Sequence, residues 1–126
     1  MLDFKKRKTE AGTLVIKVSG KLDEDSNQYF FDCVKDEIQS GNANIVINFA
    51  DLGYISSIGL GALVRASSRA AKAGGTIYLS RIENQVLEVF SIVKFERLFN
   101  IFETERAAIA AWKSSSDTLP PGGSAA

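Results

Sequence analysis

Apolar and polar positions along the chain fall into short blocks that alternate between a two-residue and a helical period. Five blocks have the pattern of strands: residues 3–9, 12–20, 44–52, 76–80 and 99–102. In residues 12–20, Leu14, Ile16 and Val18 share one face, which is typical of a half-buried strand. Residues 44–52, NIVINFADL, begin with a near-continuous apolar run. Such a run predicts a central strand covered on both faces.

Four further blocks have helical spacing: residues 26–40, 58–73, 83–93 and 104–112. Asp25 followed by Gln28 indicates a capping box at the start of the first helix. One buried stripe is expected along the second helix, formed by Leu60, Leu63, Val64, Ser67 and Ala71. Gly74 and Gly75 then supply its end.

The element order is therefore β-β-α-β-α-β-α-β-α, which predicts the α/β class. We expect a single domain with a mostly parallel, mixed sheet of about five strands and about four helices packed on it. A ligand or partner site is expected at the carboxyl ends of the strands. The domain should span residues 1–113, because residues 114–126 are rich in Ser, Gly, Pro and Ala and predict a disordered tail.

Composition narrows the function. Fifteen basic and fifteen acidic residues cancel, which argues against direct binding of nucleic acid. Absence of histidine removes the commonest general base and metal ligand, and one cysteine leaves a zinc site almost without ligands. No apolar run approaches the roughly 20 residues of a membrane span. We expect a cytoplasmic, non-enzymatic protein that needs no metal or cofactor and does not bind a membrane.

The most informative segment is YISSIGLGALV, residues 54–64, where a strand is followed by two serines and two glycines. A dinucleotide fingerprint is weakly matched, because Val64 stands at the third glycine position, and a P-loop fails for lack of Gly-Lys-Ser/Thr. A catalytic serine would lack a histidine to activate it, and nothing places Lys72 or Lys94 nearby.

Two other interpretations of this junction stay open. Serine is a preferred N-cap and glycine allows close packing of helix and strand, so spacing alone favours a structural role. A serine at a helix N-terminus also faces free N–H groups and the positive end of the helix dipole, which would stabilise an added phosphate. Physical chemistry thus permits a phosphorylation switch here without requiring one.

Four segments together resemble the STAS domain family, and most closely its free-standing anti-sigma factor antagonists: SGKLD, NIVINFADLGYISSIGLGAL, AGGTIYLS and VFSIVKFERLFNIFETERAAIAA. The resemblance covers about residues 4–112. It implies a partner-switching protein of transcription regulation that binds an anti-sigma factor with serine-protein kinase activity. That kinase would phosphorylate the antagonist and end the binding, and a serine phosphatase would restore it.

Aligned on GLG, the family's phosphorylated position falls on Ser57. Ser56 stands where the family often has Asp and Ile58 where it often has Ser or Thr, so Ser56 is the alternative phosphosite. The resemblance implies a partner-binding surface made of Asp23, Asn48, Asp51, Ser56, Ile58, Gly59, Leu60 and Gly61. Turn and cap chemistry is the competing explanation for Asn48 and Asp51. The alternative function is a STAS module that acts without phosphorylation, as a scaffold in a signalling or lipid-transport complex.

Overall fold

The structure of the chain is a computed structural model that describes residues 2–94 and 97–118. Five strands in these residues form one sheet in the order β1-β2-β3-β4-β5. They are β1 (Leu2–Lys8), β2 (Leu14–Leu22), β3 (Asn44–Ile55), β4 (Thr76–Ser80) and β5 (Asn100–Phe102). β1 runs antiparallel to β2, and all later neighbours are parallel. The predicted mixed sheet is confirmed.

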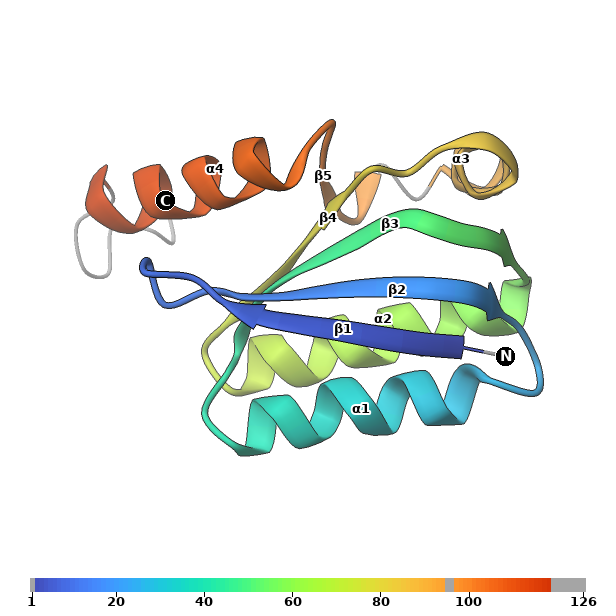
Figure 1. Cartoon of the computed structure of the whole chain (residues 1–126), viewed down its shortest axis with the longest axis horizontal. Coiled ribbons are helices and arrows are strands. Elements are labelled where there is room, and N and C mark those ends of the chain that lie inside the picture. The colour runs from blue at the N-terminus through green and yellow to red at the C-terminus, as the bar shows by residue number, and fades with distance from the viewer. Residues whose placement is uncertain (1, 95–96, 119–126) are drawn as a thin grey trace.

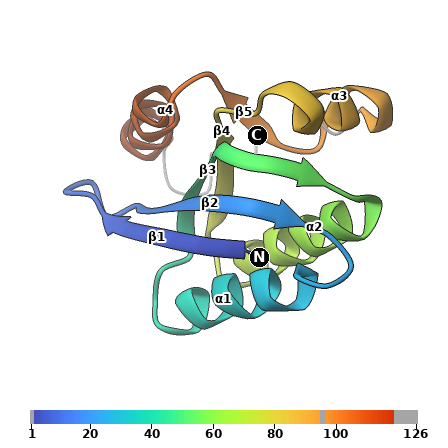
Figure 2. The same ribbon diagram turned by 45° about the vertical axis from the view of Figure 1, so that its right-hand side comes forward.

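Four α-helices within the described residues cover this sheet, two on each face (Figure 1). They are α1 (Asn27–Gln39), α2 (Ser57–Lys72), α3 (Asn84–Val93) and α4 (Glu105–Thr118). α1 and α2 lie side by side on one face, as the turned view in Figure 2 also shows. α3 and α4 lie on the other face, with α3 near the carboxyl end of β3 and α4 near the opposite end. Each helix of the β-α-β units thus returns the chain for another parallel strand.

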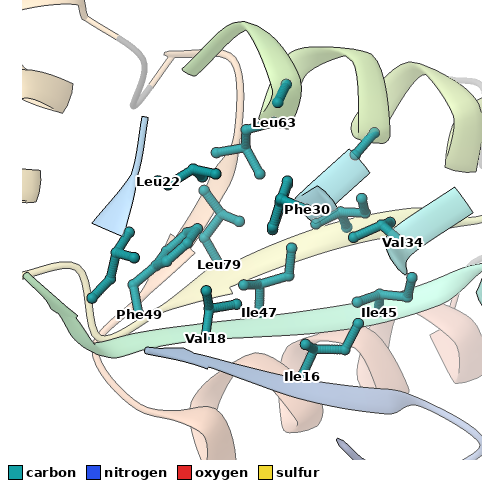
Figure 3. Packing of buried hydrophobic residues seen from close by; sticks show 14 of the residues in the cluster. Ile16, Val18, Leu22, Phe30, Val34, Ile45, Ile47, Phe49, Leu63 and Leu79 are labelled. Atoms are coloured by element: carbon teal, nitrogen blue, oxygen red, sulfur yellow. The ribbon is translucent and has the colours of Figure 1, made fainter. Parts of the chain in front are cut away.

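The main hydrophobic core lies between the sheet and the α1–α2 layer (Figure 3). Alternate residues of the central strands point into it, including Ile16, Val18, Ile47 and Phe49, and Phe30 of α1 meets them. A smaller cluster on the other face joins the sheet to α4 and consists of Val15, Val46 and Ala108. β3 is therefore covered on both faces, as its apolar run predicted.

The start of α1 differs from the predicted capping box. Ser26 is the N-cap residue and its side chain makes no capping hydrogen bond. The Gln28 amide donates to Asp32 along the helix instead of reaching back to the cap. The capping box of Asp25 and Gln28 is wrong, because Asp23 supplies the acceptor for the N–H groups of this turn.

The buried side of α2 also differs in part from the predicted stripe. Leu60 and Leu63 are buried as expected, whereas Val64 and Ala71 are exposed. Three alanines that the predicted stripe did not include are buried instead: Ala62, Ala66 and Ala70. These small side chains let α2 pack closely against α1 and the sheet.

The last helix continues beyond the domain boundary expected at residue 113. α4 runs from Glu105 to Thr118, so the predicted tail begins, in part, as helix. The domain boundary at residue 113 stays a prediction. Residues 119–126 lie outside the described residues, and their predicted disorder stays a prediction.

Candidate functional site

The candidate site lies where β2 and β3 end beside each other. Leu22, the last residue of β2, pairs with Ile55, the last residue of β3. The backbone N–H of Ser56 donates to the Leu22 carbonyl oxygen at 3.0 Å. The residues that follow the two strands, Asp23 on one and Ser56 and Ser57 on the other, therefore meet at one edge of the sheet. The structure thus places Asp23 close to the serines, and their role in binding a partner stays a prediction.

Ser56 has a structural role as the residue that caps α2. It is the N-cap of α2, with extended backbone angles of φ −99° and ψ 172°, and its hydroxyl oxygen accepts from the Gly59 N–H at 3.1 Å. Its carbonyl oxygen accepts from the N–H of Leu60 at 2.9 Å. The structural interpretation of the serine pair is thus correct for Ser56, whose side chain is half-buried and already bonded.

Ser57 stands in a different environment, although it is the next residue. It is the first residue of α2 and is exposed. Among the described residues its hydroxyl has no hydrogen-bond partner. It lies at the positive end of the helix dipole, where first-turn N–H groups lack helical acceptors. Ile58 beside it is 50% exposed. The Ser57 hydroxyl is the one of the pair that an enzyme can reach without breaking a cap.

The two glycines of the GLG segment have opposite surroundings. A Cβ atom added to Gly59 would lie 2.4 Å from the carbonyl oxygen of Leu22, so only glycine lets α2 approach β2 this closely. Leu60 is 3% exposed and packs in the core. Both residues are buried and pack within the fold, and their predicted contact with a partner stays a prediction. Gly61 is exposed, and an added Cβ would meet nothing within 4 Å.

Asp23 has a structural role that sequence reasoning missed. Its Oδ1 accepts from the N–H groups of Asp25 at 3.0 Å and Ser26 at 3.2 Å, and from the Ser26 hydroxyl at 3.2 Å. Burial acts to raise the pKa of the Asp23 carboxyl, but the hydrogen bonds from Asp25 and Ser26 outweigh it and lower the pKa. The segment D-x-D-S was the available signal, because Asp side chains commonly accept from backbone N–H groups two residues on.

A depression of about 400 Å³ adjoins this turn. Its lining residues are Leu2, Lys21, Asp23, Asp25, Ser26 and Tyr29. The Tyr29 side chain is 56% exposed and its ring lies 5.1 Å from that of Phe4. The depression therefore combines two carboxylates and the Lys21 side chain with an exposed aromatic ring.

Asn48 lies in the interior of β3 rather than at its end. β3 continues for seven residues beyond it, to Ile55, or about 23 Å at roughly 3.3 Å per residue. Asn48 is 7% exposed; its Nδ2 donates to Glu105 at 2.6 Å and its Oδ1 accepts from the Ala50 N–H at 2.8 Å. The predicted place of Asn48 beside the switch loop is wrong, and its bonds anchor α4 to the sheet.

Asp51 lies between Asn48 and the end of the strand. Its side chain is 56% exposed, and Lys17 lies across from it with Nζ 3.2 Å from Oδ2. This pair joins β2 to β3 on the face that carries α3 and α4. The predicted strand-end position of Asp51 is also wrong, because β3 runs on to Ile55.

Sequence reasoning did not single out Gln85, in the first turn of α3. Its side-chain amide makes two hydrogen bonds to the backbone of Ile55, immediately before the serine pair. No local pattern points to this contact, because the two residues are 30 positions apart.

Within residues 2–94 and 97–118, no three His, Cys, Asp or Glu side chains are grouped so that they could hold a metal ion. In the same part of the chain, no helix has the length and apolar character needed to cross a membrane.

Comparison with known proteins identifies one family. The model of the STAS domain family matches residues 5–108. A relative named as the anti-sigma factor antagonist BtrV, from Bordetella bronchiseptica, is 29% identical over 79 residues, which are 63% of this chain and 68% of BtrV.

Solved structures of other proteins share the fold, among them the following two. An anti-sigma factor antagonist from Thermotoga maritima has a TM-score of 0.75 at 23% identity and covers 86% of this chain and 92% of its own. The Bacillus cell fate determinant SpoIIAA, in its phosphorylated form, has a TM-score of 0.65 at 22% identity and covers 86% and 98%.

Proposed function

The chain belongs to the STAS domain family, and we propose that it is an anti-sigma factor antagonist controlled by phosphorylation of Ser57. It binds an anti-sigma factor with the sheet edge that carries Asp23, Ser57, Ile58 and Gly61. Phosphorylation of Ser57 ends this binding. It acts by association and not by catalysing a reaction.

One observation carries the choice of Ser57: its exposed hydroxyl has no partner among the described residues, whereas Ser56 caps α2 through Gly59. A kinase that used Ser56 would have to break that cap first, at a cost of about 1 kcal/mol. By similarity, the name of BtrV supports the role of an anti-sigma factor antagonist, and the phosphorylated form of SpoIIAA supports control by phosphorylation.

Phosphorylation would act locally. A kinase transfers the γ-phosphoryl group of ATP to Ser57 Oγ, with ADP as the leaving group and the hydroxyl proton passing to a base or to water. The product carries about −1.5 to −2 charge at neutral pH. The N-terminus of α2 stabilises part of this charge, so the domain stays folded. A partner would face the charge across a desolvated contact, where an unmatched charge costs on the order of 2–5 kcal/mol. The affinity then falls about 30-fold to several-thousand-fold.

The proposal implies two enzymes as partners: an anti-sigma factor that is also a serine-protein kinase, and a serine phosphatase that removes the phosphate. The second candidate function, a scaffold in a signalling or lipid-transport complex, needs neither. The two functions therefore differ in whether Ser57 is modified at all.

The deciding experiment is phosphopeptide mapping after incubation with ATP and each anti-sigma factor kinase of the host. We expect phosphate on Ser57 in the wild type and in Ser56→Ala, and none in Ser57→Ala. Ser56→Ala is the matched control, because it loses the helix cap but keeps the acceptor hydroxyl.

Binding measured by titration calorimetry completes the test. Ser57→Ala should bind the anti-sigma factor constitutively, and Ser57→Asp should bind much more weakly, with both variants folded by circular dichroism. Phosphate found only on Ser56, or equal affinities of the two Ser57 variants, would reject Ser57 as the switch. A wild type that binds but is never phosphorylated would favour the scaffold.

A further inference from the structure

The end of β3 extends past its neighbour β4. The parallel pairing of the two strands ends at Asn48 and Ser80, whereas β3 continues to Ile55. Beyond Ser80 the chain turns toward α3, which begins at Asn84. The edge of β3 that leads into the switch serines is therefore not paired with β4.

The side chain of Gln85 occupies the place of a β4 residue at this point. The Ile55 N–H donates to Gln85 Oε1 at 3.0 Å, and Gln85 Nε2 donates to the Ile55 carbonyl oxygen at 3.3 Å. In a parallel sheet both backbone groups of one residue face the same neighbouring strand. A carboxamide has one acceptor and a pair of donors, so it can complete both bonds.

The opposite side of the same turn is held by β2, through the hydrogen bond from Ser56 N–H to Leu22. The last peptide units before Ser57 are thus fixed on both sides, by β2 and by α3. Ile55 itself is 1% exposed, so its backbone groups have little access to water in place of Gln85. A change at Gln85 would release one side of the turn and leave the other in place.

We propose that Gln85 is a positioning residue for the modification of Ser57. Resting on the proposed function, this inference assigns Gln85 the task of fixing the direction in which the chain leaves β3 and so the place of the Ser57 hydroxyl. Gln85 acts through Ile55 and does not touch the reacting atoms. It also ties α3 to the switch, so that a displacement of α3 moves the turn that carries Ser57.

A purely local role in α3 makes the opposite prediction for Gln85→Glu. Gln85 is the second residue of the helix, where a negative charge stabilises the N-terminus. A carboxylate at this site accepts from the Ile55 N–H but cannot donate, and its other oxygen faces the Ile55 carbonyl oxygen. Protonation restores a donor, so Gln85→Glu should recover the clamp as the pH falls through the carboxyl pKa.

The first measurement is amide hydrogen exchange of Ile55 by NMR at pH 7 and pH 4, with the wild type at the same two values. Gln85→Met, of similar shape but without the amide, should lower the protection factor of the Ile55 amide about tenfold at both pH values, equivalent to one lost hydrogen bond. Gln85→Glu should keep this protection at both pH values, because its side chain still accepts from the Ile55 N–H and loses only the bond to the Ile55 carbonyl oxygen at pH 7. Wild-type protection of Ile55 in Gln85→Met overturns the clamp.

The second measurement is the rate of Ser57 phosphorylation at pH 7 by the kinase that modifies the wild type. We expect kcat/KM to fall about tenfold for Gln85→Glu and Gln85→Met, with both variants folded by circular dichroism. Wild-type rates in variants that have lost Ile55 protection overturn the positioning role and leave the proposed function intact. No phosphate on wild-type Ser57 rejects the proposed function and the positioning role together, while the exchange data still decide whether the clamp exists.

Discussion

Replacing the two glycines of the GLG segment by alanine, one at a time, distinguishes the part of this helix start that serves folding from the part that serves binding. In Gly59→Ala the new Cβ would lie 2.4 Å from the Leu22 carbonyl oxygen and 3.0 Å from Leu22 Cγ. The end of β2 or the start of α2 must then move. In Gly61→Ala the new Cβ would meet nothing within 4 Å. The two substitutions are chemically identical and lie two residues apart in one helix.

The two substitutions are expected to change the free energy of unfolding in opposite directions. Forcing a methyl group into a packed contact costs about 1–3 kcal/mol. The displacement also strains the hydrogen bond from Ser56 N–H to Leu22, worth about 1 kcal/mol. Alanine in place of glycine in a helix returns about 0.5–1 kcal/mol. We therefore expect Gly59→Ala to lower the free energy of unfolding by about 2 kcal/mol and Gly61→Ala to raise it by about 0.5–1 kcal/mol.

Urea and thermal unfolding of the two variants measure this difference. At about 4 °C per kcal/mol for a domain of this size, Gly59→Ala should melt about 8 °C below the wild type, and Gly61→Ala about 3 °C above it. Affinity for the anti-sigma factor adds a second readout, because a partner that approaches the bare backbone at Gly61 should bind Gly61→Ala more weakly despite its higher stability. A Gly59→Ala variant as stable as the wild type, or stability changes of the same sign, would refute the packing argument.

Three further predictions concern charged and polar side chains. Asp23→Ala should lower the melting temperature at pH 7, and Asp23→Asn, which keeps an acceptor but loses the charge, should lower it less. Because the folded pKa lies below the ordinary 3.8, the contribution of the charge is present at neutral pH and is lost as the pH falls through and below that value. Asn48→Ala should cost about 1–3 kcal/mol in urea unfolding, because Glu105 and the Ala50 N–H lose their partner, and weaker partner binding without a stability loss would contradict this. Lys6 Nζ and Glu37 Oε2 are 2.7 Å apart, and a double-mutant cycle at pH 7 should give a coupling free energy of about 0.2–1 kcal/mol between the two side chains. Their mutual hydrogen bond lowers the pKa of Glu37 from 4.5 and raises that of Lys6 from 10.5, so the coupling should disappear in strong acid or strong base; a coupling that persists at pH 2 would show that packing is responsible.

The strands were predictable because buried strand positions appear in the sequence as apolar residues, either alternating with polar ones or in a continuous run. β4 occupies residues 76–80 as expected, and the apolar run of β3 correctly marked the centre of the sheet. The same pattern underestimated the length of β3, because Gly53 and Tyr54 are exposed and interrupt the apolar run before the last residue, Ile55. The strand-end positions expected for Asn48 and Asp51 failed for that reason.

Only those features of the candidate site that depend on residues close together in the sequence could be predicted. The family resemblance, aligned on GLG, led to Ser57, but it could not tell the free hydroxyl from the cap of Ser56, or the buried Gly59 from the open Gly61. These distinctions depend on Leu22, which approaches from another strand. Gln85 was missed for the same reason, because its contact with Ile55 exists only once the sheet register places α3 beside the end of β3.

The turn that carries Ser57 is held by Leu22 on one side and by Gln85 on the other, and this has a consequence for the order in which the chain folds. Leu22 is synthesised well before Ser56, and Gln85 follows Ile55 by 30 residues. Contacts between residues so distant in sequence form late, because the intervening chain must be ordered first. Ser57 therefore reaches its presented position only when β2, β3 and α3 have assembled. A kinase that needs this geometry would modify completed domains and pass over nascent or misfolded chains, so the phosphate would also record successful folding.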